Sequence, residues 1–441
     1  MRKTTTALAA LAALVAAGVM AIPVTVAGAA AGPTIYVGPH TIVNDNNHSC
    51  SNTGYPTIGA AVTAAPAGST IVVCPGTYNE QVTINKSDLT VTTQGHATVA
   101  PTTATTSATD LDTGQPIAAV VDFTPAANNV NISGLWIDGT GMEAGVDGCS
   151  TDLVGVLDQA SAGHSVSGRI NGLHVKGTTP TNSGCGAGLG IFVQSHMTGT
   201  ARASLNITSN NVSGYGKNGV TCSDLRTVCA ITGNTITTSP TGLVAQNGVQ
   251  VGFGASGSVT ANHISGNQWT SWTSDTGNPQ MQSDGAAGVL LYAAGINAAG
   301  ATTATTSVHG NVLAGNDIGV EVVDSAASVT YNTITEVSPG VVDSIGIYGL
   351  GCDDYCGYFH WPTSSSPGTL NSLASLSQHV SVTYNTINFA TSPAGSYGVW
   401  LGDNSWSAGG GYSGPAGFEI VTAAPNSITH VVNPLTIGGG A

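Results

Sequence analysis

The heptapeptide Ser-Val-Thr-Tyr-Asn-Thr-Ile occurs twice in this chain, at Ser328–Ile334 and again at Ser381–Ile387. Both copies fit a unit that runs apolar-x-x-Asn-x-apolar. The same unit recurs with Asn210, Asn234, Asn262 and Asn311 in the fourth place, and with Leu135 and Leu173 there in two earlier copies. Its shortest repeats are about 21 to 24 residues, and insertions lengthen the others. A short unit repeated in series indicates a solenoid.

A second motif, Gly-apolar-x-apolar, follows most of these units about ten residues later. Counted from the glycine, positions +1 and +3 lie on one face of a strand and position +2 on the other. One unit is too short to bury its own apolar face, so the copies must stack on one another. The copies start at Gly155, Gly190, Gly219, Gly248, Gly288, Gly319, Gly346 and Gly398.

In such a stack the asparagines would repeat at one turn of every coil. We expect them to adopt the left-handed conformation that a sharp turn needs, and to bond the turns above and below as a ladder. The expected ladder consists of Asn210, Asn234, Asn262, Asn311, Asn332 and Asn385.

These repeats resemble those of the right-handed parallel β-helix superfamily, the pectate-lyase-like solenoids, over about residues 70–405. The resemblance implies an all-β fold, a single-stranded right-handed parallel β-helix of about ten coils. It does not fix an activity, because this fold carries lyases, hydrolases, esterases and non-catalytic binders. Pectate-lyase relatives pair Ca²⁺-binding acids with an Arg or Lys base, and no Lys or Arg follows Arg226. The remaining place for such a set is Asp158, Lys217, Asp224 and Arg226, and the motifs of polygalacturonases are absent.

The ends of the chain suggest export and capping. Residues 1–31 read as a signal peptide, with Arg2 and Lys3 before the apolar run Ala7–Val26; a membrane anchor is the alternative. Residues 32–95 are expected to form an N-terminal cap and the first coils, with a short helix within Tyr55–Ala65. The β-helix should occupy 96–405, with insertions near 267–285 and 351–377, and 406–441 should form a C-terminal cap or tail. We expect a secreted monomer without a membrane span after signal cleavage.

The charge is strongly unbalanced. The chain has a formal net charge of −15, with 8 Lys and Arg against 23 Asp and Glu. This argues against nucleic acid as a partner, since binding to phosphates needs clustered cations. It also disfavours a polyanionic sugar unless Ca²⁺ bridges it. A plainer interpretation is that the acidity keeps an exported protein soluble.

Eight cysteines in an exported chain indicate disulfides. Cys149 and Cys185 stand almost equally far before their Gly motifs, so stacked coils would bring them within bonding distance. Zinc is the alternative, but the spacings fit neither a finger nor a ribbon, so no metal is expected. Pairing neighbours in sequence gives Cys50–Cys74, Cys149–Cys185, Cys222–Cys229 and Cys352–Cys356.

The +2 positions of the last three Gly motifs are Glu321, Tyr348 and Trp400. If +1 and +3 face the core, these three side chains face solvent and floor a trough in the C-terminal half. Aromatic rings stack on the C–H faces of sugars and carboxylates accept their hydroxyls, so the trough fits a polysaccharide. Its substrate-binding candidates are Tyr348, Trp400, Trp269, Trp272, Trp361, His360 and Trp406. These rings could instead fasten the insertions to the coil surface.

Hydrolysis of a glycosidic bond needs two carboxyl groups, ~5 Å apart for retention or ~6.5–9.5 Å apart for inversion. The candidates for catalysis are Glu321, Asp324, Asp353, Asp354 and Asp403. The sequence therefore predicts an exported protein that engages a polysaccharide, with a glycosidase favoured over a lyase, no organic cofactor, and Ca²⁺ left open. The alternative is a non-catalytic surface or adhesion solenoid.

Overall fold

The computed structural model divides the chain into residues 1–31 and residues 32–441, and the description below concerns the second unit. The structure describes residues 32–38, 49–123, 127–160, 163–196, 199–238, 244–269, 286–296, 302–323, 325–335, 345–350, 360–361, 368–369, 378–389, 397–401, 418–422, 425–431 and 433–437. No helix in these ranges is long and apolar enough to cross a membrane.

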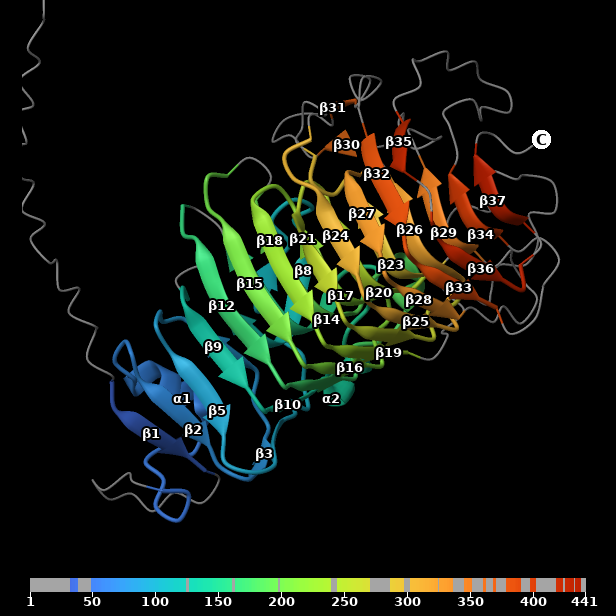
Figure 1. The fold of residues 1–441 in the computed structure, drawn as a ribbon. Coiled ribbons are helices and arrows are strands. Elements are labelled where there is room, and N and C mark those ends of the chain that lie inside the picture. Colours follow the sequence, from blue (N-terminus) through green and yellow to red (C-terminus); the bar gives the residue numbers. More distant parts are fainter. Residues whose placement is uncertain are drawn as a thin grey trace, which may run out of the picture. The chain divides into compact units, whose positions relative to one another are not determined.

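Three long parallel sheets build this unit, and the chain visits them in turn (Figure 1). We name them A, B and C in the order of the visit. Sheet A contains β1 (Thr34–Val37), β2 (Thr70–Val73), β5 (Thr90–Thr93), β9 (Val130–Ser133), β12 (Val166–Asn171), β15 (Ala203–Thr208), β18 (Thr227–Thr232), β21 (Ser256–Thr260), β24 (Thr306–His309), β27 (Ala327–Thr330), β32 (Gln378–Thr383) and β35 (Phe418–Thr422).

Sheet B contains β3 (Gly76–Tyr78), β6 (Ala97–Val99), β10 (Trp136–Asp138), β13 (His174–Lys176), β16 (Asn211–Ser213), β19 (Thr235–Thr237), β22 (His263–Ser265), β25 (Val312–Ala314), β28 (Thr333–Thr335), β33 (Thr386–Asn388) and β36 (Ser427–Thr429). Sheet C contains β4 (Val82–Ile84), β8 (Pro116–Phe123), β11 (Asp152–Ala160), β14 (Leu189–Ser195), β17 (Asn218–Ser223), β20 (Asn247–Gly252), β23 (Ala287–Tyr292), β26 (Ile318–Val323), β29 (Ile345–Leu350), β34 (Tyr397–Leu401) and β37 (Asn433–Ile437). The antiparallel strand β7 (Ala108–Thr109) adds to β8, and β30 (His360–Trp361) pairs with β31 (Gly368–Thr369).

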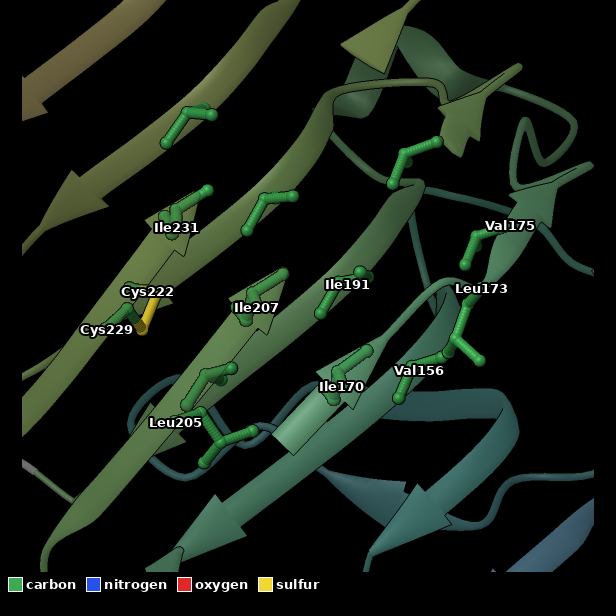
Figure 2. Close-up of a cluster of buried hydrophobic side chains, with 14 of the residues drawn as sticks. Val156, Ile170, Leu173, Val175, Ile191, Leu205, Ile207, Cys222, Cys229 and Ile231 are labelled. Carbon is green, nitrogen blue, oxygen red and sulfur yellow. A yellow bond between two sulfur atoms is a disulfide. The ribbon is translucent and has the colours of Figure 1, made fainter. Parts of the chain in front are cut away.

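The described strands thus complete eleven coils in the order A, B, C, which confirms a parallel β-helix. The last coil, β35–β37, lies in the segment expected to be only a cap or tail, and it continues all three sheets. The core is the column of inward positions on each sheet. On sheet C it includes Val156, Ile191 and Val220, in register on successive strands and fully buried (Figure 2).

The ladder asparagines stand in one buried column at the turn between sheets A and B. The Asn262 side chain shows the pattern: its Oδ1 accepts the backbone N–H and the Nδ2 of Asn234, both at 2.9 Å. Its own Nδ2 donates to Ile231 O and to Oδ1 of Asn311, both at 3.0 Å. The same contacts run from Asn210 through Asn385, and they extend one coil further to Asn426.

The expected left-handed conformation of these asparagines is wrong. The residue before each of them takes it instead, as in Ser209 (φ 55°), Ala261 (φ 54°) and Tyr331 (φ 58°). This residue makes the turn, which leaves the asparagine side chain pointing along the column. Glycine is the residue that adopts this conformation without strain, and it fills the position in other coils.

Glycine is required in the second motif for a different reason. Its φ is not positive, but its coil lies so close to the next that a side chain has no room. A Cβ on Gly219 would stand 2.5 Å from Cγ2 of Ile236 and 2.6 Å from the carbonyl oxygen of Gly248. The motif therefore marks where a strand of sheet C meets a sheet B side chain and the sheet C backbone, both of the next coil.

The N-terminal end is capped by helix α1 (Ile58–Ala64), inside the predicted range. Thr57 caps its start, and both carboxylate oxygens of Glu80 accept backbone N–H groups of Ile58 and Gly59, at 2.7 and 3.0 Å. Lys86 donates to Ala65 O at 2.8 Å at the other end. An acid at the N-terminus and a base at the C-terminus of a helix both favour it electrostatically. A second short helix, α2 (Thr140–Glu143), lies between β10 and β11.

Three disulfides are present among the described residues: Cys50–Cys74, Cys149–Cys185 and Cys222–Cys229. The third is buried in the core and joins β17 of sheet C, at the end of one coil, to β18 of sheet A, at the start of the next (Figure 2). Cys352 and Cys356 lie outside the described residues.

Candidate functional site

The outer face of sheet C carries the predicted row in register. Glu321 on β26 lies beside Tyr348 on β29, and Tyr348 lies beside Trp400 on β34. Three successive coils therefore place these residues at one level, as the sequence motif required. Stacking of the coils aligns these three residues, since insertions of unequal length separate them in sequence.

The expectation that this row faces solvent is wrong for two of its members. Glu321 and Tyr348 are each only 4 % exposed. Tyr348 packs in a small apolar cluster on the outer side of the sheet with Ala287, Ile318 and Ile345. Alternation along a strand assigns a side chain to the outer face, but other parts of the chain decide whether that face meets water. Leu290 and Tyr397 border the cluster and are partly exposed.

One insertion is fixed at its base beside this row. The carboxylate of Asp317, just before β26, accepts the backbone N–H of Trp269 at 2.7 Å. It also accepts that of Ala286, so it joins both ends of the insertion between β22 and β23. Burial raises the pKa of Asp317 to about 6, although these two hydrogen bonds lower it.

The structure describes only some of the other predicted site residues. His360 and Trp361 form β30, and Trp269 is half-buried. Trp272, Asp324, Asp353, Asp354, Asp403 and Trp406 lie outside the described residues. In the part of the chain that the structure describes, no group of three or more His, Cys, Asp or Glu side chains has an arrangement that could hold a metal ion.

A cluster of acids on the N-terminal half of the same sheet was not expected. The segment that carries β7 crosses the outer face there and is fastened by Gln194 of β14. The amide oxygen of Gln194 accepts from Leu111 N at 3.2 Å and from Gln159 Nε2 at 2.9 Å. Its Nε2 then donates to Oδ2 of Asp110 at 3.2 Å and of Asp112 at 3.4 Å. The orientation of this amide is therefore set by four contacts.

Asp224 completes this cluster from the turn after β17. It is 3 % exposed, its backbone has φ 80°, and its Oδ2 has no hydrogen-bond partner. Burial raises its pKa well above the ordinary range, and the neighbouring Asp112 raises it further. A buried carboxyl whose pKa is raised by its surroundings is a feature that acid catalysts share.

Other carboxyls near this end of sheet C behave similarly. Burial raises the pKa of Asp122 to about 6, and burial together with the charge of Asp110 raises that of Asp152 to about 7. Asp158 is fully enclosed, one of its oxygens has no partner, and burial raises its pKa well above the ordinary range. Lys217, the base considered with these acids, donates instead to the backbone oxygen of Ala245.

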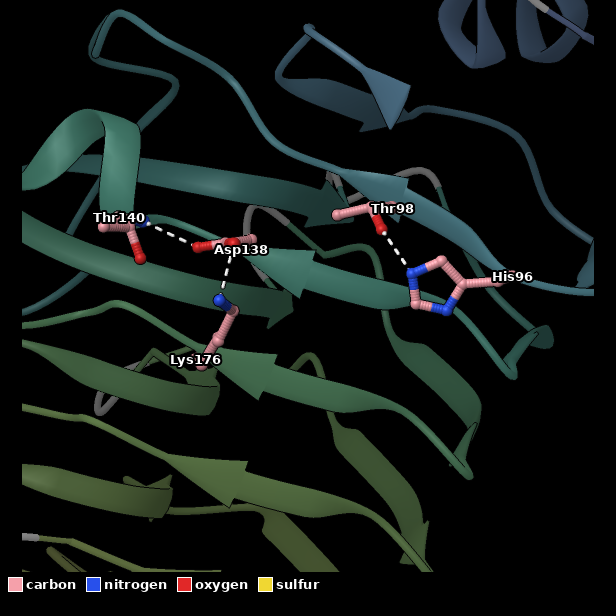
Figure 3. A network of polar contacts seen from close by, with 5 residues as sticks. All are labelled: His96, Thr98, Asp138, Thr140 and Lys176. Atoms are coloured by element: carbon pink, nitrogen blue, oxygen red, sulfur yellow. Dashed lines mark hydrogen bonds and ion pairs between the residues drawn. The ribbon is translucent and has the colours of Figure 1, made fainter. Parts of the chain in front are cut away.

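On sheet B, a stacked set of rings lies on the outer face. The ring of Trp136 stacks on that of His174 with centroids 4.3 Å apart, and His96 lies on its other side at 4.7 Å. Next to them Lys176 and Asp138 form an ion pair of 2.9 Å, drawn with His96 in Figure 3. Because Trp136 and His174 lie in register on neighbouring coils, we interpret this set as packing between coils.

Comparison with known proteins gives the fold and no closer relationship. No family model matches the chain, and no curated protein matches it. Among solved structures, the GH136 lacto-N-biosidase from Eubacterium ramulus superposes with a TM-score of 0.52 at 10% identity, over 92% of this chain and 68% of that one. Its selenomethionine derivative gives 0.50 at 10% identity, over 92% and 67%. The Dettilon tailspike protein gp208 gives 0.43 at 13% identity, over 92% and 68%.

At such low identity these similarities are evidence about fold alone. The two lacto-N-biosidase structures agree with the three parallel sheets described above. The chain therefore has the parallel β-helix fold.

Proposed function

We propose that this protein is exported and engages a polysaccharide along the outer face of sheet C in its C-terminal half. The observation that carries the proposal is the row Glu321, Tyr348 and Trp400, aligned on three successive coils. A carboxylate and two aromatic residues at one level are the combination that binds hydroxyls and C–H faces of sugars.

The connections of the chain support this location. The residues that join β22 to β23 enter sheet C at one edge, next to Asp317. The residues that join β29 to β32 and β34 to β35 leave it at the opposite edge. These long connections contain Trp272, Trp361 and Trp406 in the sequence. Ligand sites are often built from loops that a rigid scaffold positions.

Export is supported by the three disulfides, because such bonds persist in oxidising surroundings. The lacto-N-biosidase of the same fold acts on glycans, as its name states, and glycans are the class of ligand we propose here. Cleavage would need Glu321 with a second carboxyl from Asp324, Asp353, Asp354 or Asp403 at the separation set by retention or inversion. Ca²⁺ enters the proposal only as a bridge to an acidic sugar.

The alternative is a non-catalytic adhesion solenoid, and one observation favours it. Glu321 and Tyr348 are 4 % exposed, which is less than a carboxylate and a ring in direct contact with substrate would have. A bound sugar would then touch the partly exposed Tyr397 rather than the whole row.

The test is retention of the purified protein on a panel of insoluble polysaccharides, with and without Ca²⁺, together with an assay for new reducing ends. We expect Trp400→Ala and Tyr397→Ala to weaken retention about tenfold, since buried aromatic contacts dominate binding energy. Trp136→Ala on sheet B is the matched control and should bind normally.

Release of reducing ends that Glu321→Gln abolishes would establish a hydrolase. Retention without cleavage would support the adhesion solenoid. Retention that is unchanged in both sheet C variants would refute this location.

A further inference from the structure

The charges of the described chain are sorted by face. Acids gather on and around sheet C, where Asp122, Asp152, Asp158 and Glu321 lie on its strands. Sheet A has the opposite character. Eleven of its twelve strands contain no Asp or Glu, and the exception is Glu419 on β35 at the C-terminal end. In a chain with 23 acids, this face is nearly free of negative charge.

The same face holds the arginines. Apart from Arg2, the chain has three, Arg169, Arg202 and Arg226, and all three are exposed. They belong to three successive coils of sheet A (Figure 1). Arg169 lies on β12, Arg202 directly precedes β15, and Arg226 directly precedes β18.

Backbone hydrogen bonds stack the last two arginines at one level. The Arg202 carbonyl accepts from Val166 N at 2.8 Å, and the Arg226 carbonyl accepts from Ala203 N at 3.3 Å. Neighbouring strands are about 4.8 Å apart, so the two side chains start within one strand spacing of each other. Arg169 is in register with Asn206, four residues beyond Arg202, which places it roughly 13 Å further along the strand direction.

A polar groove surrounds Arg169. It has a volume of about 560 Å³ and is open to solvent along the outer face of β9, β12 and β15. Its lining is made of amides and hydroxyls, with Arg169 as its one charged residue. The lining includes Asn131, Ser133, Ser167, Asn171, Ser204 and Asn206.

Within the described ranges, the three guanidinium groups have no protein partner. The described residues contain a single ion pair, Lys176–Asp138 on sheet B, and no hydrogen bond from Arg169, Arg202 or Arg226 side chains is made within the described ranges. Each group therefore presents its donors to solvent. On the strands of this face Glu419 is the one acid, and Asp88 borders the groove, where it accepts a hydrogen bond from Asn129 at 2.8 Å. The three arginines therefore outnumber the carboxylates near them and make the surface from β12 to β18 locally positive on a protein of net charge −15.

We propose that the outer face of sheet A, from β9 to β18, binds an anionic glycan whose carboxylate or sulfate groups pair with Arg169, Arg202 and Arg226. The guanidinium fork matches both anions with two parallel hydrogen bonds. The amides and hydroxyls of the groove bind the sugar hydroxyls between the charges. Single-stranded nucleic acid fits less well, because its bases need aromatic platforms and the groove lining has none.

This proposal shares with the proposed function only the class of ligand, since it concerns another sheet and other residues. It also revises the expectation from composition that a polyanionic sugar requires Ca²⁺. A low count of cations says little about affinity when folding places three of them on one face.

The test uses the full chain and three polymers with one backbone: dextran, carboxymethyl-dextran and dextran sulfate. We expect binding to one or both anionic forms without Ca²⁺, weakening as salt rises, and no binding to dextran on this face. The variant Arg169→Gln with Arg202→Gln should weaken binding about a hundredfold, since each of the two charge-assisted pairs is worth about tenfold. Arg→Lys at the same two positions should recover part of the affinity, because the charge remains but the fork is lost.

The matched control is Lys86→Gln with Lys176→Gln, which removes the same charge from other places. Equal weakening by the control pair would show a general charge effect and refute the site. Binding that is lost in Trp400→Ala but kept in the arginine variant would assign the anionic glycan to sheet C. Absence of binding to both anionic dextrans, or tighter binding to an oligothymidine at the same salt, would overturn the proposal. If sheet C binds the neutral dextran backbone, all three polymers are retained, and the extra affinity of the anionic forms that the arginine variant removes is then the measure of this site.

Discussion

The asparagine ladder makes a quantitative prediction for Asn262→Leu. Leucine occupies the same position of the repeat at Leu135 and Leu173, where it is buried, so the substitution fits the column sterically. The change removes four hydrogen bonds, two accepted by Oδ1 and two donated by Nδ2. At about 1 kcal/mol of net stability each, the loss is about 4 kcal/mol. The added burial of leucine offsets about 1 kcal/mol of this, which leaves about 3 kcal/mol.

The assay is urea unfolding of the full chain with its disulfides intact, followed by far-UV circular dichroism. The matched control is Asn211→Leu, which changes an exposed asparagine next to the column and should cost less than about 0.5 kcal/mol. A loss below about 1 kcal/mol for Asn262→Leu, or a loss equal to that of the control, would refute the ladder as a source of stability.

Three further substitutions test other features. Asp122→Asn should raise the melting temperature at pH 7.5 but not at pH 4. The folded pKa of Asp122, about 6, lies above the ordinary 3.8. Its protonated form therefore contributes fully to the free energy of unfolding below pH 4, and up to about 3 kcal/mol of this is lost by pH 6. An equal effect of the substitution at both pH values would contradict this. Gly219→Ala should cost about 1–3 kcal/mol, because its Cβ would meet the Gly248 carbonyl at 2.6 Å, and thermal unfolding without loss would argue against close coil contact. Replacing Cys222 and Cys229 together with Ala should cost about 2.5 kcal/mol for so short a loop, measured against the wild type under the same oxidising conditions.

Local sequence repeats predict much of the fold. The apolar-x-x-Asn-x-apolar unit and the Gly motif carry the period, the alternation and the turn, and all of these act over a few residues. All six predicted ladder asparagines stand in one column. Asn426 is not predicted as a member, because only the second half of its unit matches the apolar-x-x-Asn-x-apolar pattern. The position of the left-handed residue, one before the asparagine, could not be read from composition, since Gly, Ser, Ala and Tyr all occupy it.

The candidate sites depended far more on tertiary structure. The sequence placed Glu321, Tyr348 and Trp400 on one face, but burial of that face is decided by segments from elsewhere in the chain. Asp110, for example, reaches Gln194 across 84 residues of sequence.

By itself, then, the sequence determined a stack of parallel coils, because the forces that form each coil are local and repeat. Folding decided which faces remain open, and it gathered Arg169, Arg202 and Arg226 on sheet A while the acids collected around sheet C. Connections of unequal length separate these residues along the chain, so their spacing in sequence does not predict that they share one face. The physical reason is that surface charge and exposure depend on neighbours in space, which the stacking of coils supplies.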